Sequence, residues 1–575
     1  MLSRRALAAV MMVVLTLSMV VPGAVAQEPI PDWPDHYDPF TLLTYNLTLT
    51  QDNWETIKHD LTFDIEVPAL FWAGGEGYAP DEPILISVRR KSCDSYPLDD
   101  QGNPEKVSLK IDINEYFDDD TEACDGDYGF PGATCLDEWH DVKKLSLENG
   151  DDNNVVTEGF AYYLHQIAAE SQLDYVASKT SWVKLYVELT DCHDELGAPV
   201  DCPEPFYNGI FVNVQQRDKT FLKNNLNPGT GDDLWEGDET WLYKYSDPYS
   251  PEIEEWPDDI YPDPVDSPNY EFLNFEPFQR KGTPPDDFVD VLNERINMEG
   301  LLTLAAVSAF HISPDDLISK GKNFFFVDYS DALMSDGDPN TDYRRQYFQW
   351  DLDSAFSGVD VEADIYDVGD LKFGVYEDFI IDNPVFNEWY TAIMQALLDG
   401  PFNEADLLAA VTAIEAEIGD ALAADPHSNL GDAVPDWFDA FRGFLSARIA
   451  NVQAQLPDPT SVDLLWFGAT EEDKKGITLG WETANETDCA GFNIYRAGSM
   501  DGERVQINEE LIPARIPGSP SGAVYGFTDE SVKPKRTYYY WLEDVDMSGH
   551  VELHEDMVVE AWAWEEKAKH ERPGR

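Results

Sequence analysis

The alternation of hydrophobic and polar positions divides the chain into stretches of different predicted secondary structure. From about residue 60 to residue 245, apolar residues recur at every second position, for example in 85–90 and 107–113, which predicts strands. From 288 to 456 the apolar residues are spaced three or four positions apart, most regularly in 405–418, which predicts helices. The pattern therefore predicts a mixed α+β region of some 400 residues.

Two further changes of pattern suggest boundaries. The stretch 246–287 is rich in Pro, Asp and Glu, and we interpret it as an acidic surface loop. The Pro-containing stretch 457–460 is typical of a linker. Short strands separated by turn-forming residues then follow over 461–565, which is the pattern of a small β-sandwich, and 566–575 is a polar tail.

Two short apolar runs, 322–328 and 347–356, carry the most distinctive polar residues. Each run is typical of a short buried strand. The first begins with Asn323, and the second ends in Asp351 and Asp353, whose alternate positions would face the same side of a strand. If the two strands pair as a hairpin, these oxygens converge, and they are the hard ligands that Mg²⁺ or Mn²⁺ prefers. The sequence therefore predicts a divalent-metal site at this hairpin.

The first 26 residues have the composition of a secretory signal peptide. A basic start is followed by an apolar run, 6–21, and by small residues that end at Ala26. We expect a signal peptide over 1–26 and no integral membrane segment after its cleavage, because no later stretch is long and apolar enough. The expected location is secreted or at the surface of a bacterial cell.

Six cysteines in an exported chain favour disulfides. Cys124 and Cys135 bracket one polar loop and Cys192 and Cys202 bracket another, so both pairs are candidates for local disulfides. The two remaining cysteines are Cys93 and Cys489.

The net charge of −74 excludes nucleic acid as an expected partner, because binding to phosphates needs basic patches. The charge has three interpretations, namely solubility in a salty medium, binding of Ca²⁺, or attraction of basic substrates. For Ca²⁺ the candidate is an acidic run with Asp328, Asp331, Asp336, Asp338 and Asp342. A hydrated acidic loop is the other interpretation of that run.

Five segments, taken in order, resemble the CotH (spore-coat protein H) kinase family, whose members are relatives of protein kinases. The resemblance extends from about Pro83 to Leu456, and residues 461–563 resemble a fibronectin type III-like module. The five segments are Lys143–Asn149 with Val156–Glu158, Gly209–Lys223, Trp241–Lys244, Lys322–Phe326 and Trp350–Phe356, and 440–456 resembles the closing helix of the family.

The resemblance implies a two-lobed, atypical protein-kinase-like domain over 27–456, followed by an all-β immunoglobulin-like sandwich. The β-rich lobe would span about 60–245 and the helical lobe 288–456. The implied activity is transfer of the γ-phosphoryl group of ATP, with Mg²⁺ or Mn²⁺, to Ser/Thr of extracellular or surface proteins. The sequence leaves the acceptor protein and the oligomeric state open.

The resemblance also implies site residues. Asp351 matches the metal-binding aspartate of the family's W-D-x-D segment, Asp353 supports it, and Asn323 matches the second metal ligand. Asp316 resembles the catalytic-loop aspartate that precedes the metal-binding Asn in protein kinases, and its neighbour Asp315 competes for the role. The other interpretation of Asp316 is a helix N-cap.

On the phosphate side, Lys110 lies on the predicted strand 107–113, and we expect it to contact phosphates and to pair with Glu158 on the helix that follows. Lys106 and Lys144 compete with it. Arg89 is the candidate phosphate clamp, together with Lys91.

The sequence departs from the family pattern at three places, the first two of which favour another function. Arg89–Ser92 lacks the Gly that the family has there, Gln215 replaces a Glu, and the insertion Tyr329–Tyr343 lengthens the metal hairpin. The alternative is a non-catalytic surface or matrix-binding protein that uses a kinase-like scaffold with Ca²⁺-binding acidic loops.

Overall fold

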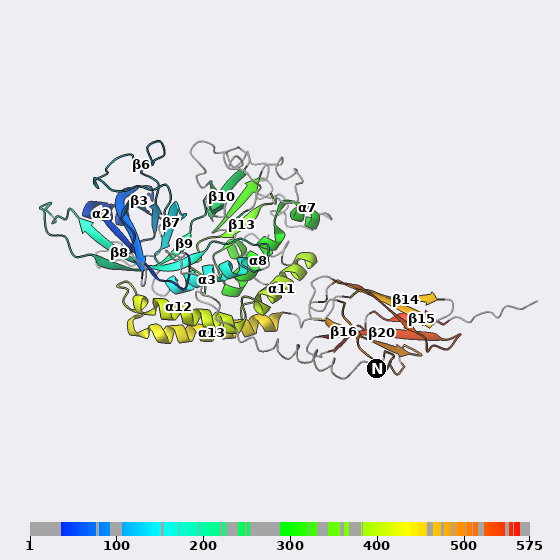
Figure 1. Cartoon of the computed structure of the whole chain (residues 1–575). Helices are drawn as coiled ribbons and strands as arrows, with labels where there is room; N and C mark the ends of the chain where they lie inside the picture. Colours follow the sequence, from blue (N-terminus) through cyan, green and yellow to red (C-terminus); the bar gives the residue numbers. More distant parts are fainter. Residues whose placement is uncertain are drawn as a thin grey trace, which may run out of the picture. The chain divides into compact units, whose positions relative to one another are not determined.

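The computed structural model divides the chain into two compact units, Met1–Gln455 and Leu456–Arg575 (Figure 1). The residues that the structure describes are 36–75, 80–91, 106–150, 154–171, 173–194, 196–218, 221–222, 225–226, 240–247, 250–253, 288–320, 323–329, 343–356, 361–366, 381, 383–456, 464–472, 476–484, 486, 489–500, 502–508, 510–515, 522–546, 551–555 and 557–563. The predicted signal peptide, the linker 457–460, the tail 566–575 and almost all of the acidic loop lie outside them.

The first unit begins with a closed seven-stranded barrel whose interior is apolar. In barrel order, the strands are β1 (Leu43–Thr50), β2 (Val67–Gly75), β3 (Ile84–Arg90), β4 (Leu109–Asp112), β7 (Lys144–Glu148), β9 (Phe206–Gln215) and β8 (Thr180–Thr190). Neighbouring strands are antiparallel except β1 and β8, whose parallel pairing closes the barrel. Leu109, Ile111, Leu145 and Leu147 point inward, so the polar residues between them lie on the outer face.

Helix α3 (Asn154–Ala169) packs on the outside of β8 and β9. The approach is close because Gly159 has no side chain: a Cβ atom there would lie 2.4 Å from the ring of Trp182. Trp182 Nε1 also donates a hydrogen bond to the carbonyl of Val155, 2.9 Å away. Helix α3 is thereby fixed against the barrel.

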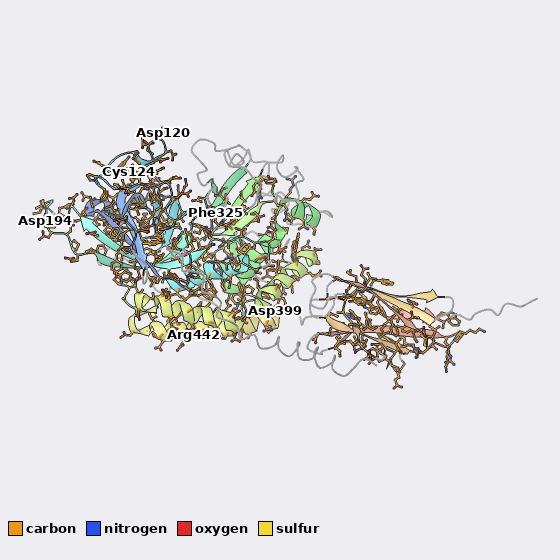
Figure 2. The ribbon with its side chains drawn as sticks, viewed as in Figure 1. Asp120, Cys124, Asp194, Phe325, Asp399 and Arg442 are labelled. Carbon is orange, nitrogen blue, oxygen red and sulfur yellow. A yellow bond between two sulfur atoms is a disulfide. The ribbon has the colours of Figure 1, made fainter. Side chains whose placement is uncertain are left out.

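A second sheet has the order β11-β10-β12-β13. The predicted hairpin is confirmed, since β12 (Phe324–Tyr329) and β13 (Gln346–Gln349) pair antiparallel with Phe324 opposite Gln349. Aromatic side chains surround it, and Phe325, labelled in Figure 2, is fully buried. The other two strands are β10 (Thr240–Asp247) and β11 (Ser250–Ile253).

Helices form the rest of the first unit. Helix α8 (Met298–His311) is buried at every position except Glu299, as expected for a helix that is apolar on all sides. Helices α12 and α13 lie side by side (Figure 1), and α12 also contacts β9. The helices are α2 (Gln51–His59), α7 (Phe288–Arg295), α9 (Leu317–Lys320), α11 (Pro384–Asp399), α12 (Glu404–Ala423), the 3₁₀ turn η4 (Gly431–Ala433) and α13 (Val434–Gln455).

Both predicted local disulfides are confirmed. Cys124–Cys135 closes the loop that follows the short hairpin of β5 (Phe117–Asp118) and β6 (Ala123–Cys124). Cys192–Cys202 closes the loop between β8 and β9. Figure 2 labels Cys124 and Asp194, which mark the two loops at the periphery of the barrel.

The second unit is the predicted β-sandwich. One sheet has the order β14-β15-β19, and the other contains β17-β16-β20-β21, with β18 and β22 as additional partners. Trp481, Phe492 and Tyr540 are buried between them, and Cys489 is a buried free thiol. The strands are β14 (Leu464–Glu472), β15 (Gly476–Thr483), β16 (Cys489–Ala497), β17 (Val505–Gln506), β18 (Ile512–Pro513), β19 (Val524–Asp529), β20 (Thr537–Asp546), β21 (Val551–Leu553) and β22 (Val559–Trp562).

The chain is thus a mixed α+β protein in which a barrel-like sheet and a helical segment precede a β-rich unit. None of the helices in the described ranges has both the length and the hydropathy that a membrane span requires.

Candidate functional site

A buried ion pair joins the ends of two barrel strands. Lys91 directly follows β3, and its backbone N–H donates to the carbonyl of Ser108, 2.9 Å away. Its ammonium group pairs with the carboxylate of Glu148, the last residue of β7. The side chains are only 9% and 11% exposed, and the hydroxyl of Ser146 donates to Glu148 at 3.1 Å. Burial and this extra hydrogen bond hold the pair in one orientation.

The same lysine contacts the predicted metal hairpin. The Lys91 ammonium lies 3.8 Å from the centre of the Trp350 ring, and Trp350 immediately precedes Asp351. A cation over an indole face is attracted to the ring quadrupole. The barrel and the hairpin therefore meet at Trp350, the residue directly before Asp351.

Glu158, in the first turns of α3, faces this junction. Burial raises the pKa of Glu158 well above its ordinary value, and the charges of Glu148, Asp353 and Asp351 raise it further, whereas Lys91 lowers it. The structure thus brings together three predicted site residues, Glu158, Asp351 and Asp353, with Lys91 and Glu148. Carboxylates outnumber lysines among these five residues, so their electrostatic field favours an additional cation.

The reason why the two aspartates converge differs from the predicted one. Strand β13 ends at Gln349, so Asp351 and Asp353 do not alternate along a strand. Asp351 instead has a left-handed backbone with φ of 54°, and its N–H donates to the hydroxyl of Tyr162 on α3, 3.1 Å away. The prediction that strand alternation aligns the two carboxylates was wrong, because the chain leaves the strand two residues earlier.

Asn323, before β12, lies at the same end of the hairpin as Trp350. It is buried and left-handed, with φ of 57°. Its Nδ2 donates to the carbonyl oxygen of Asp315 at 2.8 Å and lies 3.4 Å from the carboxylate oxygen Oδ2 of the same residue. The structure therefore places Asp315 directly beside Asn323.

Asp316 has the geometry of a helix cap. Its Oδ1 accepts the N–H groups of Ile318 and Ser319, each at 2.9 Å, at the start of α9. Burial raises the pKa of Asp316, and hydrogen bonds from Ser319, Ser308 and Ile318 oppose that effect. These contacts are those of an N-cap, which was the other interpretation of Asp316. Its neighbour Asp315 is half-buried.

Of the remaining predicted cations, Lys110 lies beside Ser146 on the same outer face of the barrel as Glu148. Lys110 is paired in register between Arg89 on β3 and Ser146 on β7. Arg89 donates to the carbonyl of Phe63 at 2.6 Å, on the loop before β2. Lys144 forms an ion pair with Asp112 at 3.0 Å. The charge of Lys91 is among the main influences on the pKa of Glu158.

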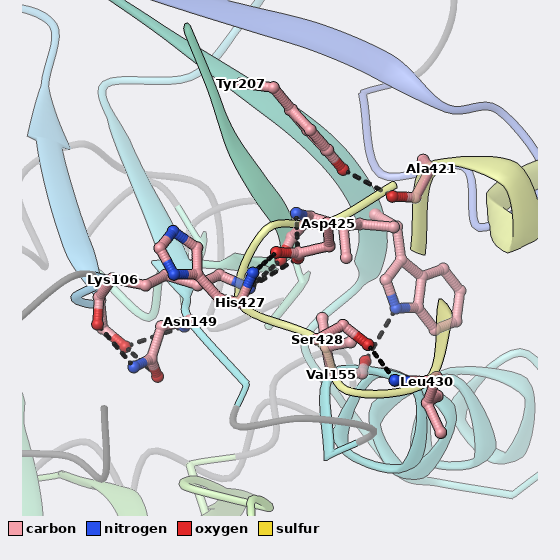
Figure 3. Close-up of polar contacts among 12 residues, drawn as sticks. Lys106, Asn149, Val155, Tyr207, Ala421, Asp425, His427, Ser428 and Leu430 are labelled. Atoms are coloured by element: carbon pink, nitrogen blue, oxygen red, sulfur yellow. Dashed lines mark hydrogen bonds and ion pairs between the residues drawn. The ribbon is translucent and has the colours of Figure 1, made fainter. Parts of the chain in front are cut away.

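Lys106 belongs to a structural cluster, shown in Figure 3. Its Nζ donates to the carbonyl of Ile210 at 2.8 Å and to the Asp425 carboxylate at 3.1 Å, and both side chains are almost fully buried. Asp425 also accepts the N–H groups of Ile210 and His427, each at 2.8 Å. These contacts attach the loop after α12 to β9.

Sequence reasoning missed the roles of Glu148, Tyr162 and Arg217. Glu148 lies within the segment Lys143–Asn149, but at a position that the quoted family motif leaves open. Arg217, two residues beyond β9, is 1% exposed and lies over the rings of Trp350, Phe325 and Tyr162, at 4.9, 5.4 and 5.6 Å from their centres. No local pattern distinguishes these residues from ordinary strand or helix positions.

The residues present fit a nucleotide with a divalent metal. In the described ranges, no three or more His, Cys, Asp or Glu side chains form a group that could hold a metal ion. Mg²⁺ ordinarily takes one or two carboxylates together with substrate phosphates, and Asp351 and Asp353 can supply the carboxylates. Lys91 and Arg217 supply positive charge for phosphates. Ser92 and most of the acidic run proposed for Ca²⁺ lie outside the described residues.

Comparison with known proteins gives a match to one family. The family model described as CotH kinase protein matches residues 99–435, which is more than half of the 575 residues. No curated protein matches the chain in sequence. Among solved structures, an Fn3-like protein from Clostridium thermocellum is similar to part of the chain, with 14% sequence identity, coverage of 19% of this chain and 100% of that protein, and a TM-score of 0.13.

Proposed function

The chain belongs to the CotH kinase protein family, and we propose that it is an exported protein kinase that transfers the γ-phosphoryl group of ATP to Ser or Thr hydroxyls of extracellular or surface proteins. The observation that carries the proposal is the convergence of Lys91, Glu148, Glu158, Asp351 and Asp353 at the junction of the barrel, α3 and the hairpin. We also propose that the chain has the two-lobed fold of an atypical protein kinase.

Lys91 and Glu148 form the lysine–glutamate pair that kinases use to hold phosphates. Glu148 comes from a barrel strand, and Glu158 on α3 lies behind it. Burial raises the pKa of Glu158 well above its ordinary value, which disfavours the charged form of this carboxyl. Lys91 is therefore held chiefly by Glu148, with its positive charge directed to the junction.

Asp351 and Asp353 are the proposed metal ligands, with Asn323 contributing its amide oxygen. When bound, Mg²⁺ or Mn²⁺ neutralises charge on the phosphate oxygens of ATP during transfer. The N–H of Asp351 donates to the hydroxyl of Tyr162, and this hydrogen bond fixes the backbone of Asp351. The hairpin therefore positions the carboxylates before a metal arrives.

Asp315 is the proposed catalytic base, since it lies beside Asn323 and is half-buried rather than enclosed. It accepts the proton of the acceptor hydroxyl as the oxygen of that hydroxyl bonds to the γ-phosphorus. The bond between the γ-phosphorus and the β–γ bridging oxygen breaks, and ADP leaves with that oxygen. Asp316 keeps the loop in place by capping α9.

The composition of residues 1–26 supports export, which is part of the proposal together with a secreted or surface location. The non-catalytic alternative is a surface or matrix-binding protein. The departures at Arg89–Ser92 and Gln215 favour it, and the assembled Lys91–Glu148 pair favours the kinase.

The experiment is incorporation of label from γ-³²P-ATP with Mn²⁺ or Mg²⁺, into the chain itself and into a mixture of extracellular proteins. We expect the wild type to transfer label and Asp351→Ala to lose at least about 100-fold of the rate, the scale of losing one group that stabilises transition-state charge. The matched control, Asp399→Ala, removes an exposed carboxylate at the end of α11 and should leave transfer unchanged. Absence of label with the wild type, and no rise in melting temperature with ATP and Mn²⁺, would favour the non-catalytic alternative.

A further inference from the structure

We propose that Arg217 binds a phosphate group of the nucleotide, which makes it a phosphate ligand of this site in addition to Lys91. The inference rests on the proposed function, because the anion that it names is a phosphate of ATP.

The first observation is a buried cation whose nearest polar neighbour among the described residues is the hydroxyl of Tyr162. Arg217 is 1% exposed, and none of its three guanidinium nitrogens makes a geometrically acceptable hydrogen bond to the described part of the chain. Burial lowers the pKa of Arg217, and the nearby hydroxyl of Tyr162 and the charge of Glu148 raise it. A guanidinium carries five N–H donors and remains charged in proteins. Burying these donors without acceptors costs free energy unless a ligand supplies the acceptors.

Arg448 shows what a structural buried arginine looks like in the same unit. It is fully buried on α13, and its nitrogens donate to four carbonyl oxygens, those of Ala309, Phe310, Val361 and Ala363, at 2.6–3.1 Å. These bonds hold the end of α8 and the segment 361–363. Arg217 has no such carbonyl partners among the residues that the structure describes, so the contacts seen there do not give it a structural role of this kind.

The second observation is its position in the site. The guanidinium lies 4.9 Å from the centre of the Trp350 ring, and the Lys91 ammonium lies 3.8 Å from the centre of the same ring. Lys91 is paired with Glu148, whereas Arg217 forms no ion pair with a carboxylate of the described residues. Two cations therefore converge on the residue that precedes Asp351, and for one of them the described part of the chain supplies no acceptor within hydrogen-bonding geometry.

A phosphate is the chemical group that fits these donors. Its oxygens accept parallel N–H bonds from the planar guanidinium, a geometry that ammonium groups do not offer. The carboxylates of Asp351 and Asp353 are not the acceptors in this structure, and as metal ligands they would be committed elsewhere. Trp350 is 7% exposed and covers both cations, so we infer that its ring shifts when a phosphate reaches Arg217.

The test measures binding to the full chain by titration calorimetry with Mn²⁺, using ATP, adenosine and inorganic pyrophosphate as probes. We expect Arg217→Met to weaken ATP and pyrophosphate binding by about 10-fold to 100-fold, the range for hydrogen bonds to a charged group. Adenosine affinity should be unchanged, because adenosine has no phosphate. If the role of Arg217 were purely structural, the substitution would change the affinities for all three probes or for none of them.

Arg345→Met is the matched control. Arg345 is equally buried and lies 4.8 Å from the centre of the Phe326 ring, but it stands before β13, at the other end of that strand from Trp350. It should leave the affinity for ATP unchanged. If Arg217→Met does not fold, as judged by circular dichroism, Arg217→Gln, which keeps a polar side chain without the charge, replaces it.

The outcomes separate the inference from the proposed function. Phosphate transfer by the wild type, with unchanged ATP affinity in the folded Arg217 variant, overturns the inference and leaves the function standing. Pyrophosphate binding that depends on Arg217, without any phosphate transfer, supports the inference and overturns the function. A wild type that binds neither ATP nor pyrophosphate overturns the inference as well.

Discussion

At the scale of single residues, Asp315 and Asp316 are neighbours with different surroundings. Asp315 contacts Asn323, whereas Asp316 caps α9. We expect Asp315→Asn to lose phosphate transfer by at least about 100-fold with little change in melting temperature. Asp316→Ala should keep transfer but lower stability, by roughly 0.5–2 kcal/mol, the range for a lost N-cap. Transfer rates and urea unfolding of both variants decide between them, and the reverse pattern would make Asp316 the base.

Two buried histidines near the hairpin make stability depend on pH. His165 Nε2 and His311 Nε2 are 3.1 Å apart, and both rings are fully buried. Burial lowers the pKa of His165 well below its ordinary value and lowers that of His311 to about 3. Because the unfolded chain binds protons at these residues below pH 6.5 and the folded chain does not, folding free energy is lost as the pH falls through that value.

We expect each of the two histidines to lower the free energy of unfolding by roughly 1 kcal/mol when the pH falls from 7 to 5.5. Urea unfolding of the wild type and of His311→Gln at pH 7, 6 and 5.5 measures the effect. The variant should lose less stability than the wild type over this range. Equal losses in both proteins would show that His311 does not remain neutral in the fold.

Part of the site could be predicted from residue types alone. Asn323, Asp351 and Asp353 were found because three polar residues interrupt apolar runs, and Glu158 was found through its family segment. The pairing of Lys91 with Glu148 could not be predicted, because the two residues are 57 positions apart and meet only when β3, β4 and β7 lie side by side in the barrel. Both resemble ordinary polar residues at strand ends.

At the scale of elements, the position of α3 depends on one glycine. A Cβ atom at Gly159 would lie 2.4 Å from the Trp182 ring, and Glu158 is its neighbour. We expect Gly159→Ala to lower the unfolding free energy by about 1–3 kcal/mol, as overpacking does, and to reduce phosphate transfer by displacing Glu158 and Tyr162. Urea unfolding and the transfer assay test both effects.

Gly443→Ala provides the control, since Gly443 is an exposed position of α13 with nothing within 4 Å of an added Cβ atom. It should raise stability by roughly 0.5–1 kcal/mol, because alanine favours a helix over glycine. Equal effects of the two substitutions would contradict the role assigned to the contact between Gly159 and Trp182.

The ion pair of Lys106 with Asp425 attaches the loop after α12 to the barrel (Figure 3). Lys106→Met leaves a buried carboxylate without its cation, which costs about 3–5 kcal/mol of unfolding free energy. Lys144→Met breaks a partly exposed pair and should cost at most about 1 kcal/mol. Urea unfolding compares the two variants. Similar costs in both would mean that the pair at Lys106 is not the attachment that the structure suggests.

For the hairpin, the periodicity of apolar residues predicted the two strands but not the bend that follows the second one. Strands β12 and β13 and their pairing were predicted from apolar runs and are confirmed. The bend after Gln349 was not predicted, because Asp351, with its positive φ, donates its N–H to the hydroxyl of Tyr162, which lies 189 positions away in the sequence. Local pattern gives the strands, and a distant contact determines where the second strand ends.

At the scale of the whole molecule, the changes of hydrophobic pattern located a mixed α+β region and a β-sandwich. Closure of the barrel was not predicted, because β1 and β8 pair in parallel and lie about 140 residues apart. The barrel also begins at Leu43, ahead of the predicted start near residue 60. The subdivision into two lobes remains a prediction of the family resemblance.

The proposed kinase site is built around Lys91, and a comparison of two lysine variants tests this assignment. Phosphate transfer and ATP affinity are measured for Lys91→Met and Lys110→Met in the full chain with Mn²⁺. We predict that Lys91→Met loses transfer by at least about 100-fold, as expected when a charge that stabilises the transferring phosphate is removed, and that Lys110→Met remains close to the wild type. Loss of transfer in Lys110→Met with activity retained in Lys91→Met would contradict the account and restore the assignment made from the sequence.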